Sequence, residues 1–166
     1  MQIERATSKN ILEVMYLLQH CIKDFNDKSI YQWNLSYPDY NKVLDEIKSD
    51  SLFVAKINGV CVATITLNEQ QEAAFENVNW HNKTNKFLVI HRLAVFPSWQ
   101  KKGIGRKLIE FAEELALKNN LKSIRLDISD SCKYLISLYE TFGYNHTGDI
   151  LYPKQKESFK CLEKVI

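Results

Sequence analysis

The chain has 166 residues and a formal net charge of +2; 45% of its residues are hydrophobic and 25% are charged. This length and composition are typical of one globular domain with a sizeable core, so we expect a single domain over residues 1–166. Because basic residues are spread along the chain and no apolar stretch reaches the roughly 20 residues of a membrane span, neither a nucleic-acid partner nor a membrane segment is expected.

The N-terminal residues indicate the cellular compartment, and the spacing of the cysteines indicates whether a metal or a disulfide is expected. The opening residues "MQIERATSKN" lack the apolar segment of a signal peptide, which favours a soluble cytoplasmic protein. The cysteines lie far apart, with no CxxC pair and no histidine at ligand spacing, so no metal and no disulfide are expected. They are read as mostly buried free thiols: Cys21, Cys61, Cys132 and Cys161.

Residues 2–7 form a short strand candidate, after which Ser8 can cap a helix. The apolar residues of this helix recur at helical spacing: Ile11, Val14, Met15, Leu18 and Ile22. Residues 26–37 are aromatic but aperiodic and predict a loop. Pro38 then opens a second helix, with Tyr40, Val43, Leu44 and Ile47 on one face.

A hairpin is predicted where two apolar runs, residues 51–57 and 60–67, flank Asn58-Gly59. Asn and Gly tolerate the positive φ angles of a two-residue hairpin turn. A polar segment, residues 68–84, then leads into "NKFLVIHRLAV", whose long apolar run indicates a central strand buried on both faces.

The C-terminal part predicts a helix from Gly103 to near Asn119-Asn120, a strand over residues 122–128 and a helix over residues 132–142 stopped by Gly143. Two strands follow, over residues 144–150 and 158–166. An antiparallel front followed by a β-α-β crossover predicts an α/β fold. We expect a mixed central sheet of about six to seven strands with helices on both faces.

The stretch "VFPSWQKKGIG" joins the central strand to the next helix. The first N–H groups of a helix have no internal partner and its dipole is positive there, so such a terminus can bind an anion. Gly103 and Gly105 allow close approach, while Lys101, Lys102 and Arg106 add charge. A phosphate-bearing ligand is expected.

Two familiar phosphate loops do not fit this stretch. A Walker loop requires Gly, four residues and then Gly-Lys-Ser/Thr, which is absent. The dinucleotide fingerprint requires a third small residue where this chain has Leu108.

The sequence resembles the GNAT superfamily of acyl-CoA-dependent N-acetyltransferases. Their signature, Gln or Arg, two residues, Gly, one residue, then Gly or Ala, stands here as Gln100-Lys101-Lys102-Gly103-Ile104-Gly105. The likeness includes "RLAVFP" before the signature, "LYETFGY" after it and the order of elements over nearly the whole chain.

The resemblance implies that acetyl-CoA is the co-substrate. The loop amides would hold the coenzyme pyrophosphate, and the backbone of Leu93, Ala94 and Val95 would pair with the pantetheine arm. For the arm to lie there, the fourth and fifth strands must splay apart. The family commonly has Asn where this chain has Cys132, so a side-chain contact to the cofactor is missing or supplied otherwise.

Acyl transfer requires an unprotonated amine, a stabilised oxyanion and a proton for the departing thiolate. Tyr139 matches the tyrosine that many members of the superfamily use as the general acid. The alternative is that Tyr139 only packs the core, because it belongs to a helical stripe with Leu135, Leu138 and Phe142.

The general base is less defined. His91 lies two residues before Leu93, so both side chains share one sheet face, and arylalkylamine N-acetyltransferases have a histidine at the matching place. Their second histidine is replaced here by Val89. A packed structural histidine is the alternative to this role. Glu69 is a weaker rival base and is also assigned to acceptor binding.

Acceptor binding is assigned to two segments, because loops at the rim of a scaffold shape pockets. One contains Tyr31, Trp33 and Asn34; the other contains Phe75, Trp80 and His81. These aromatic residues can clasp an amine, or they can seal an edge of the core.

The sequence therefore predicts an N-acetyltransferase that transfers acetyl to a primary amine of a small molecule or peptide by direct attack in a ternary complex. No cysteine sits in a recognisable nucleophile setting, which favours that route. A non-catalytic acyl-CoA sensor and a protein-modifying acetyltransferase are the alternatives, and homodimerisation is left open.

Overall fold

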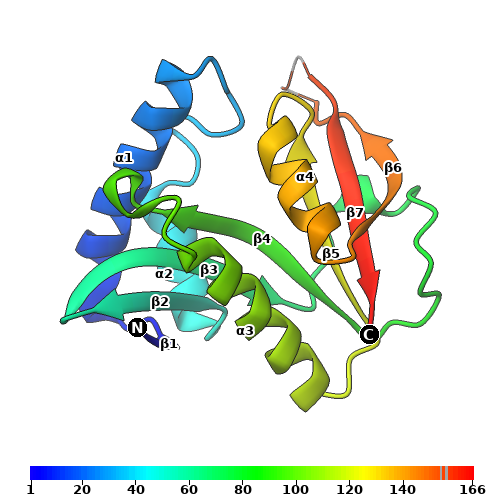
Figure 1. Ribbon diagram of the computed structural model, residues 1–166, viewed down its shortest axis with the longest axis horizontal. Helices are drawn as coiled ribbons and strands as arrows, with labels where there is room; N and C mark the ends of the chain where they lie inside the picture. The colour runs from blue at the N-terminus through cyan, green and yellow to red at the C-terminus, as the bar shows by residue number, and fades with distance from the viewer. Residues whose placement is uncertain (154, 156) are drawn as a thin grey trace. The chain divides into compact units, whose positions relative to one another are not determined.

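The computed structural model describes residues 1–153, 155 and 157–166 (Figure 1). The chain divides into two compact units. The first contains residues 1–67 and 91–111, and the second contains residues 68–90 and 112–166. Strand β4 (Phe87–Val95) and helix α3 (Ile104–Lys118) each contribute residues to both units.

The first unit contains most of the N-terminal half. Its further elements are β1 (Gln2–Arg5), the 3-10 turn η1 (Ser8–Asn10), α1 (Ile11–Asp27), α2 (Tyr40–Lys48), β2 (Leu52–Ile57), β3 (Val60–Asn68) up to Leu67, and the 3-10 turn η3 (Pro97–Trp99). Strand β2 pairs antiparallel with both β1 and β3. The predicted hairpin turn is confirmed, with φ of 50° at Asn58 and 79° at Gly59.

Two predicted helix starts are wrong by a few residues. Ser8 does not cap α1: it begins the η1 turn, and Asn10 is the N-cap residue of α1. Pro38 does not open α2, because Asp39 stands between them as the N-cap. The Asp39 carboxylate accepts a hydrogen bond from the Lys42 N–H at 2.8 Å, which satisfies a donor that the helix leaves free.

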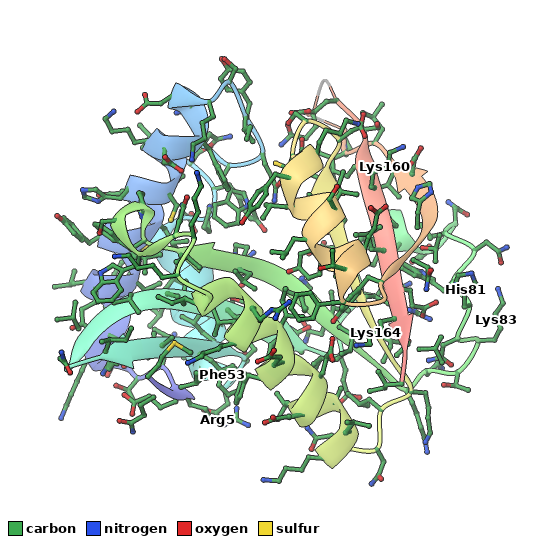
Figure 2. The ribbon with its side chains drawn as sticks, viewed as in Figure 1. Arg5, Phe53, His81, Lys83, Lys160 and Lys164 are labelled. Atoms are coloured by element: carbon green, nitrogen blue, oxygen red, sulfur yellow. The ribbon has the colours of Figure 1, made fainter. Side chains whose placement is uncertain are left out.

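The strands of the first unit are covered on both faces. Val14 and Leu18 of α1 and Val43 of α2 form a core cluster with Leu52 and Val54 of β2. Phe53 lies between the last two in sequence, so it points to the opposite face, where its ring meets Phe111 of α3 at 5.1 Å (Figure 2).

The second unit is built on the strand predicted over residues 122–128. It contains the 3-10 turn η2 (Ala73–Phe75), β5 (Ser123–Ser129), α4 (Lys133–Thr141), β6 (Asn145–Ile150) and β7 (Phe159–Val165). Strand β5 pairs parallel with β4 through Phe87–Ile90 and antiparallel with β7, which pairs antiparallel with β6.

Across the described residues, the strands form a seven-stranded sheet with the order β1-β2-β3-β4-β5-β7-β6. The predicted mixed α/β architecture and the order of its elements are confirmed. The splay of β4 from β5 stays a prediction. In the part of the chain that the structure describes, no helix has both the length and the apolar content needed to cross a membrane.

Candidate active site

The predicted anion loop lies between β4 and α3. Lys101 and Gly103 have positive φ angles of 59° and 79°, which turn the backbone before the helix. The Lys107 N–H bonds to the Gly103 carbonyl at 3.1 Å. This bond is the first turn of α3, so the N–H groups before Lys107 lie at the positive end of the helix dipole.

The two loop glycines differ in what surrounds them. A Cβ atom added at Gly103 would meet nothing within 4 Å, so open space lies beside this residue. A Cβ added at Gly105 would meet side-chain atoms of Leu93 and Val95 at 4.0 Å, an ordinary contact. Packing within the protein therefore does not require glycine at position 105.

The charge of the loop is positive. Lys101, Lys102 and Arg106 are exposed, and the first turn of α3 contains no acidic residue. The Lys102 ammonium lies 4.8 Å from the centroid of the Trp99 ring. With the helix dipole, these side chains make the loop suited to an anionic group.

Gln100 connects the loop to α1 and β4 of the first unit by hydrogen bonds. Its side-chain amide donates to the Val95 carbonyl at 3.2 Å and to the Asp24 carboxylate at 3.3 Å. The Cys21 thiol donates to the same Val95 carbonyl at 3.3 Å. The Val95 carbonyl thus has internal partners.

Burial alternates along the second half of β4. His91, Leu93 and Val95 are half-buried, whereas Arg92 and Ala94 are buried. Because Leu93 and Val95 face Gly105, the alternation places His91 on the α3 face of the strand. The alternating burial agrees with the shared face predicted for His91 and Leu93, and the catalytic role of His91 stays a prediction.

Tyr139 lies on the last turns of α4 and is 5% exposed. Burial raises the pKa of its hydroxyl above the ordinary value, so the group keeps its proton at neutral pH. A protonated hydroxyl is the state that a general acid requires.

Cys132 is the N-cap residue of α4, seven residues before Tyr139, and makes no side-chain cap bond. Burial raises the pKa of its thiol to about 11. Burial also raises the pKa of Cys21 to about 12, of Cys61 to about 11 and of Cys161 to about 12. Because the thiolate is the nucleophile, these shifts disfavour an acyl-enzyme at neutral pH.

Some of the residues predicted to bind the acceptor are exposed to solvent, and others are buried. Tyr31 is 61% exposed, and Asn34 and Glu69 are also exposed. Trp33 is buried with its ring 5.3 Å from that of Phe25.

Trp80 is likewise buried, 5.2 Å from the fully buried Phe75. The burial of both tryptophans favours the alternative that they seal the core. His81 keeps an exposed ring, while its backbone N–H donates to Glu163 at 2.5 Å.

A buried network that the sequence analysis missed fixes the loop before α2. Arg92 of β4 forms an ion pair with Glu46 of α2 and donates to the Tyr37 hydroxyl at 2.6 Å. The Thr66 hydroxyl donates to Glu46 at 3.0 Å. The arginine inside the apolar run "VIHRLAV" was the available signal, because a buried charge requires a partner.

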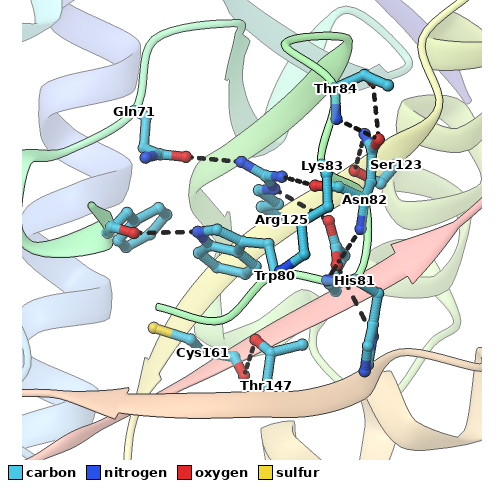
Figure 3. Close-up of polar contacts among 12 residues, drawn as sticks. Gln71, Trp80, His81, Asn82, Lys83, Thr84, Ser123, Arg125, Thr147 and Cys161 are labelled. Carbon is cyan, nitrogen blue, oxygen red and sulfur yellow. Dashed lines mark hydrogen bonds and ion pairs between the residues drawn. The ribbon is translucent and has the colours of Figure 1, made fainter. Parts of the chain in front are cut away.

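A second missed network lies in the second unit (Figure 3). Arg125 of β5 donates to Glu163 of β7 at 3.0 Å, to Gln71 at 2.7 Å and to the Asn82 carbonyl at 2.6 Å. Its guanidinium lies 4.7 Å from the centroid of the Trp80 ring. These contacts fix the connection between β3 and β4, the second segment predicted to bind the acceptor.

No group of three or more His, Cys, Asp or Glu side chains within the described ranges is placed to hold a metal ion. Residues 7–144 match the model of the acetyltransferase (GNAT) family. The chain belongs to the GNAT family. The family and fold class predicted from the sequence are therefore confirmed, and the prediction of an acetyl-CoA-dependent N-acetyltransferase agrees with them.

Two relatives from Bacillus subtilis are enzymes. The chain is 32% identical to S-(2-succino)cysteine N-acetyltransferase over 69% of its own length and 66% of the relative's. It is 24% identical to S-alkylcysteine N-acetyltransferase over 84% of its length and 75% of the relative's.

The fold also matches that of PaiA N-acetyltransferase from Thermoplasma acidophilum, a structure solved in complex with coenzyme A. The TM-score is 0.74 at 17% identity, and the match covers 99% of this chain and 98% of that one. At this identity the match shows a shared fold.

Proposed function

We propose that the chain acts as one N-acetyltransferase domain over residues 1–166 and transfers acetyl from acetyl-CoA to a primary amine of a small molecule. The observation that carries this proposal is the basic glycine turn at the start of α3, which stands at the position of the GNAT signature. Open space beside Gly103 and ordinary contacts at Gly105 support a role of this turn in binding an external anion.

The coenzyme would be held by two parts of the first unit. The N–H groups of residues 101–106 would bind its pyrophosphate, with charge from Lys101, Lys102 and Arg106. Backbone groups of Leu93 and Ala94 would bond to the amides of the pantetheine arm. The bound thioester supplies the acetyl group and a thiolate leaving group.

Tyr139 would donate its proton to the departing thiolate. Its raised pKa keeps that proton in place until negative charge develops on the sulfur. His91 would accept the proton lost by the amine, directly or through a water, and Glu69 is the rival for this step. The amine nitrogen attacks the thioester carbon, the C–N bond forms and the C–S bond breaks, with no acyl-enzyme.

We propose the α-amino group of an S-substituted cysteine as the acceptor, because two curated relatives are named for such substrates. Exposed Tyr31 and Asn34 are the first candidates to contact it. A peptide amine is the alternative acceptor.

Thiol release from acetyl-CoA tests the proposal. S-(2-succino)cysteine, S-methylcysteine, a short peptide and a polyamine are supplied in turn, with cysteine thioethers expected to give the highest kcat/KM. Tyr139→Phe is expected to lower kcat by about a hundredfold, within the range of general acid catalysis. Equal rates for wild type and Tyr139→Phe would show that Tyr139 is not the acid.

A non-catalytic acyl-CoA sensor is the second candidate, favoured by Cys132 at the place where the family commonly has Asn. It predicts tight coenzyme binding by calorimetry with no thiol release for any amine. A homodimer and a cytoplasmic location stay predictions, and light scattering after gel filtration tests the first of them.

A further inference from the structure

The C-terminal end of α4 ties Tyr139 to Tyr144 through the backbone. The Tyr144 N–H donates to the Tyr139 carbonyl at 3.2 Å, and the Gly143 N–H donates to the Glu140 carbonyl at 2.9 Å. Gly143 has a φ of 84°. This pair of bonds is the Schellman motif, in which the residue after the left-handed glycine contacts the residue three positions inside the helix end.

The side chains of Tyr139 and Tyr144 are also in contact. The rings of Tyr139 and Tyr144 lie 5.2 Å apart at an interplanar angle of 78°, an edge-to-face pair. Tyr144 is 2% exposed and is followed at once by β6, whose Asn145 pairs with Glu163 of β7. Tyr144 is therefore fixed to the sheet, whereas Tyr139 belongs to the helix end.

Two charged side chains, Lys164 and Glu113, lie near the Tyr144 side chain. The Lys164 ammonium of β7 lies 5.8 Å from the ring centroid and donates to the Glu113 carboxylate at 2.8 Å (Figure 2). Burial first, and then the charges of Tyr139 and Glu113, raise the pKa of the Tyr144 hydroxyl, so it stays neutral. The ring is also 2% exposed, so close packing restricts its motion.

The Tyr144 hydroxyl is buried next to the Glu113 carboxylate, which contributes to its raised pKa. The hydroxyl therefore interacts with Glu113, whereas the contact with Tyr139 is made by the ring.

We infer that Tyr144 is a positioning residue for Tyr139: its ring, locked to the sheet, holds the ring of the proposed acid in one orientation at the end of α4. This inference rests on the acid role proposed for Tyr139. It adds a residue on which the rate of the chemical step depends and which contacts neither amine nor coenzyme.

A double-mutant cycle tests the inference. Tyr144→Leu is expected to lower kcat by about tenfold while KM for acetyl-CoA changes less than twofold. In the Tyr139→Phe background the same substitution is expected to have no further effect, because its target is gone. The control Tyr144→Phe keeps the ring and should retain kcat within twofold. An equal loss of kcat in both backgrounds would overturn the inference.

Fluorine NMR tests the positioning role without enzyme turnover, so it applies even if Tyr139 is not the general acid. The eight tyrosines are labelled as 3-fluorotyrosine, and the resonance of Tyr139 is identified in the fluorine NMR spectrum by its loss in Tyr139→Phe. Tyr144→Leu should shift or broaden this resonance, whereas Tyr144→Phe should leave it in place.

Tyr152 provides the internal control, because its ring forms a similar pair with Phe159 at 5.1 Å. Its resonance should not move in Tyr144→Leu. A Tyr139 resonance unchanged in Tyr144→Leu, or a Tyr152 resonance moved as far as that of Tyr139, would overturn the positioning role. Failure of the acid role shows separately, as full thiol release by Tyr139→Phe.

Discussion

Arg125 donates from Nε to Glu163 Oε1 at 3.0 Å, and both side chains are almost completely buried. The other oxygen of Glu163 accepts the backbone N–H groups of His81 and Asn82 at 2.5 and 3.2 Å. One carboxylate thus connects β7 to β5 and to the polar connection that precedes β4. The Glu163 carboxylate satisfies the Arg125 guanidinium and both backbone donors at a site where the two charged side chains are buried.

Glu163→Gln should lower the free energy of unfolding by about 3 kcal/mol, because it leaves the Arg125 charge buried without its counterion. Urea unfolding followed by circular dichroism measures this change. The exposed pair Lys23–Asp27 provides the control, and Asp27→Asn should change the free energy of unfolding far less, because solvent screens this pair. Equal losses in the two variants would show that the buried pair has no special role.

Gly103→Ala should lower the free energy of unfolding by about 1 kcal/mol, because a φ of 79° is unfavourable for a residue with a Cβ atom. KM for acetyl-CoA should rise by about tenfold as the new methyl enters the open space beside the loop. Gly105→Ala is the matched control, since its Cβ meets only ordinary contacts at 4.0 Å. It should leave the free energy of unfolding and KM nearly unchanged.

Replacing Lys101 and Lys102 together by Ala should raise KM for acetyl-CoA by about tenfold and leave kcat within twofold, because both side chains would bind an anion in ground and transition states alike. The difference should shrink between 50 and 500 mM salt, as screening weakens the wild-type attraction. Lys118→Ala, at the far end of α3, should have no such effect. A salt-independent difference would argue against an electrostatic role for the pair.

Stability should fall at alkaline pH. The thiols of Cys21, Cys61, Cys132 and Cys161 have a folded pKa of about 11 to 12, above the ordinary value of 9.0, because burial disfavours the thiolate. The folded state therefore holds these protons longer than the unfolded state. Their contribution is complete below pH 9 and is lost as the pH rises toward 11 to 12.

Thermal melts from pH 8 to pH 11 measure this loss, and Cys21→Ser should flatten the slope by removing one of the groups. The same shifts predict slow alkylation of the native protein by iodoacetamide at pH 7.5. Rapid labelling of Cys132 at that pH would instead indicate an accessible thiolate and reopen the acyl-enzyme route.

The sequence alone determined the order of the elements and the glycine turn before α3, because both depend on local patterns. Apolar periodicity, Asn58-Gly59 and the spacing of Gly103 and Gly105 act over a few residues, where backbone geometry decides the outcome. Helix starts were less exact, since Asp39 and Asn10 compete with neighbouring residues for the N-cap position.

Only the tertiary structure decided which polar residues meet across the fold. Glu46 and Arg92, and likewise Arg125 and Glu163, lie far apart in the chain, and no local pattern pairs them. In the structure Trp33 and Trp80 lie in buried clusters, although they were predicted to contact the acceptor. Tertiary packing also brings Lys164, paired with Glu113, to the ring of Tyr144. Burial and long-range pairing depend on the whole chain, because each buried charge or ring needs partners that other segments supply.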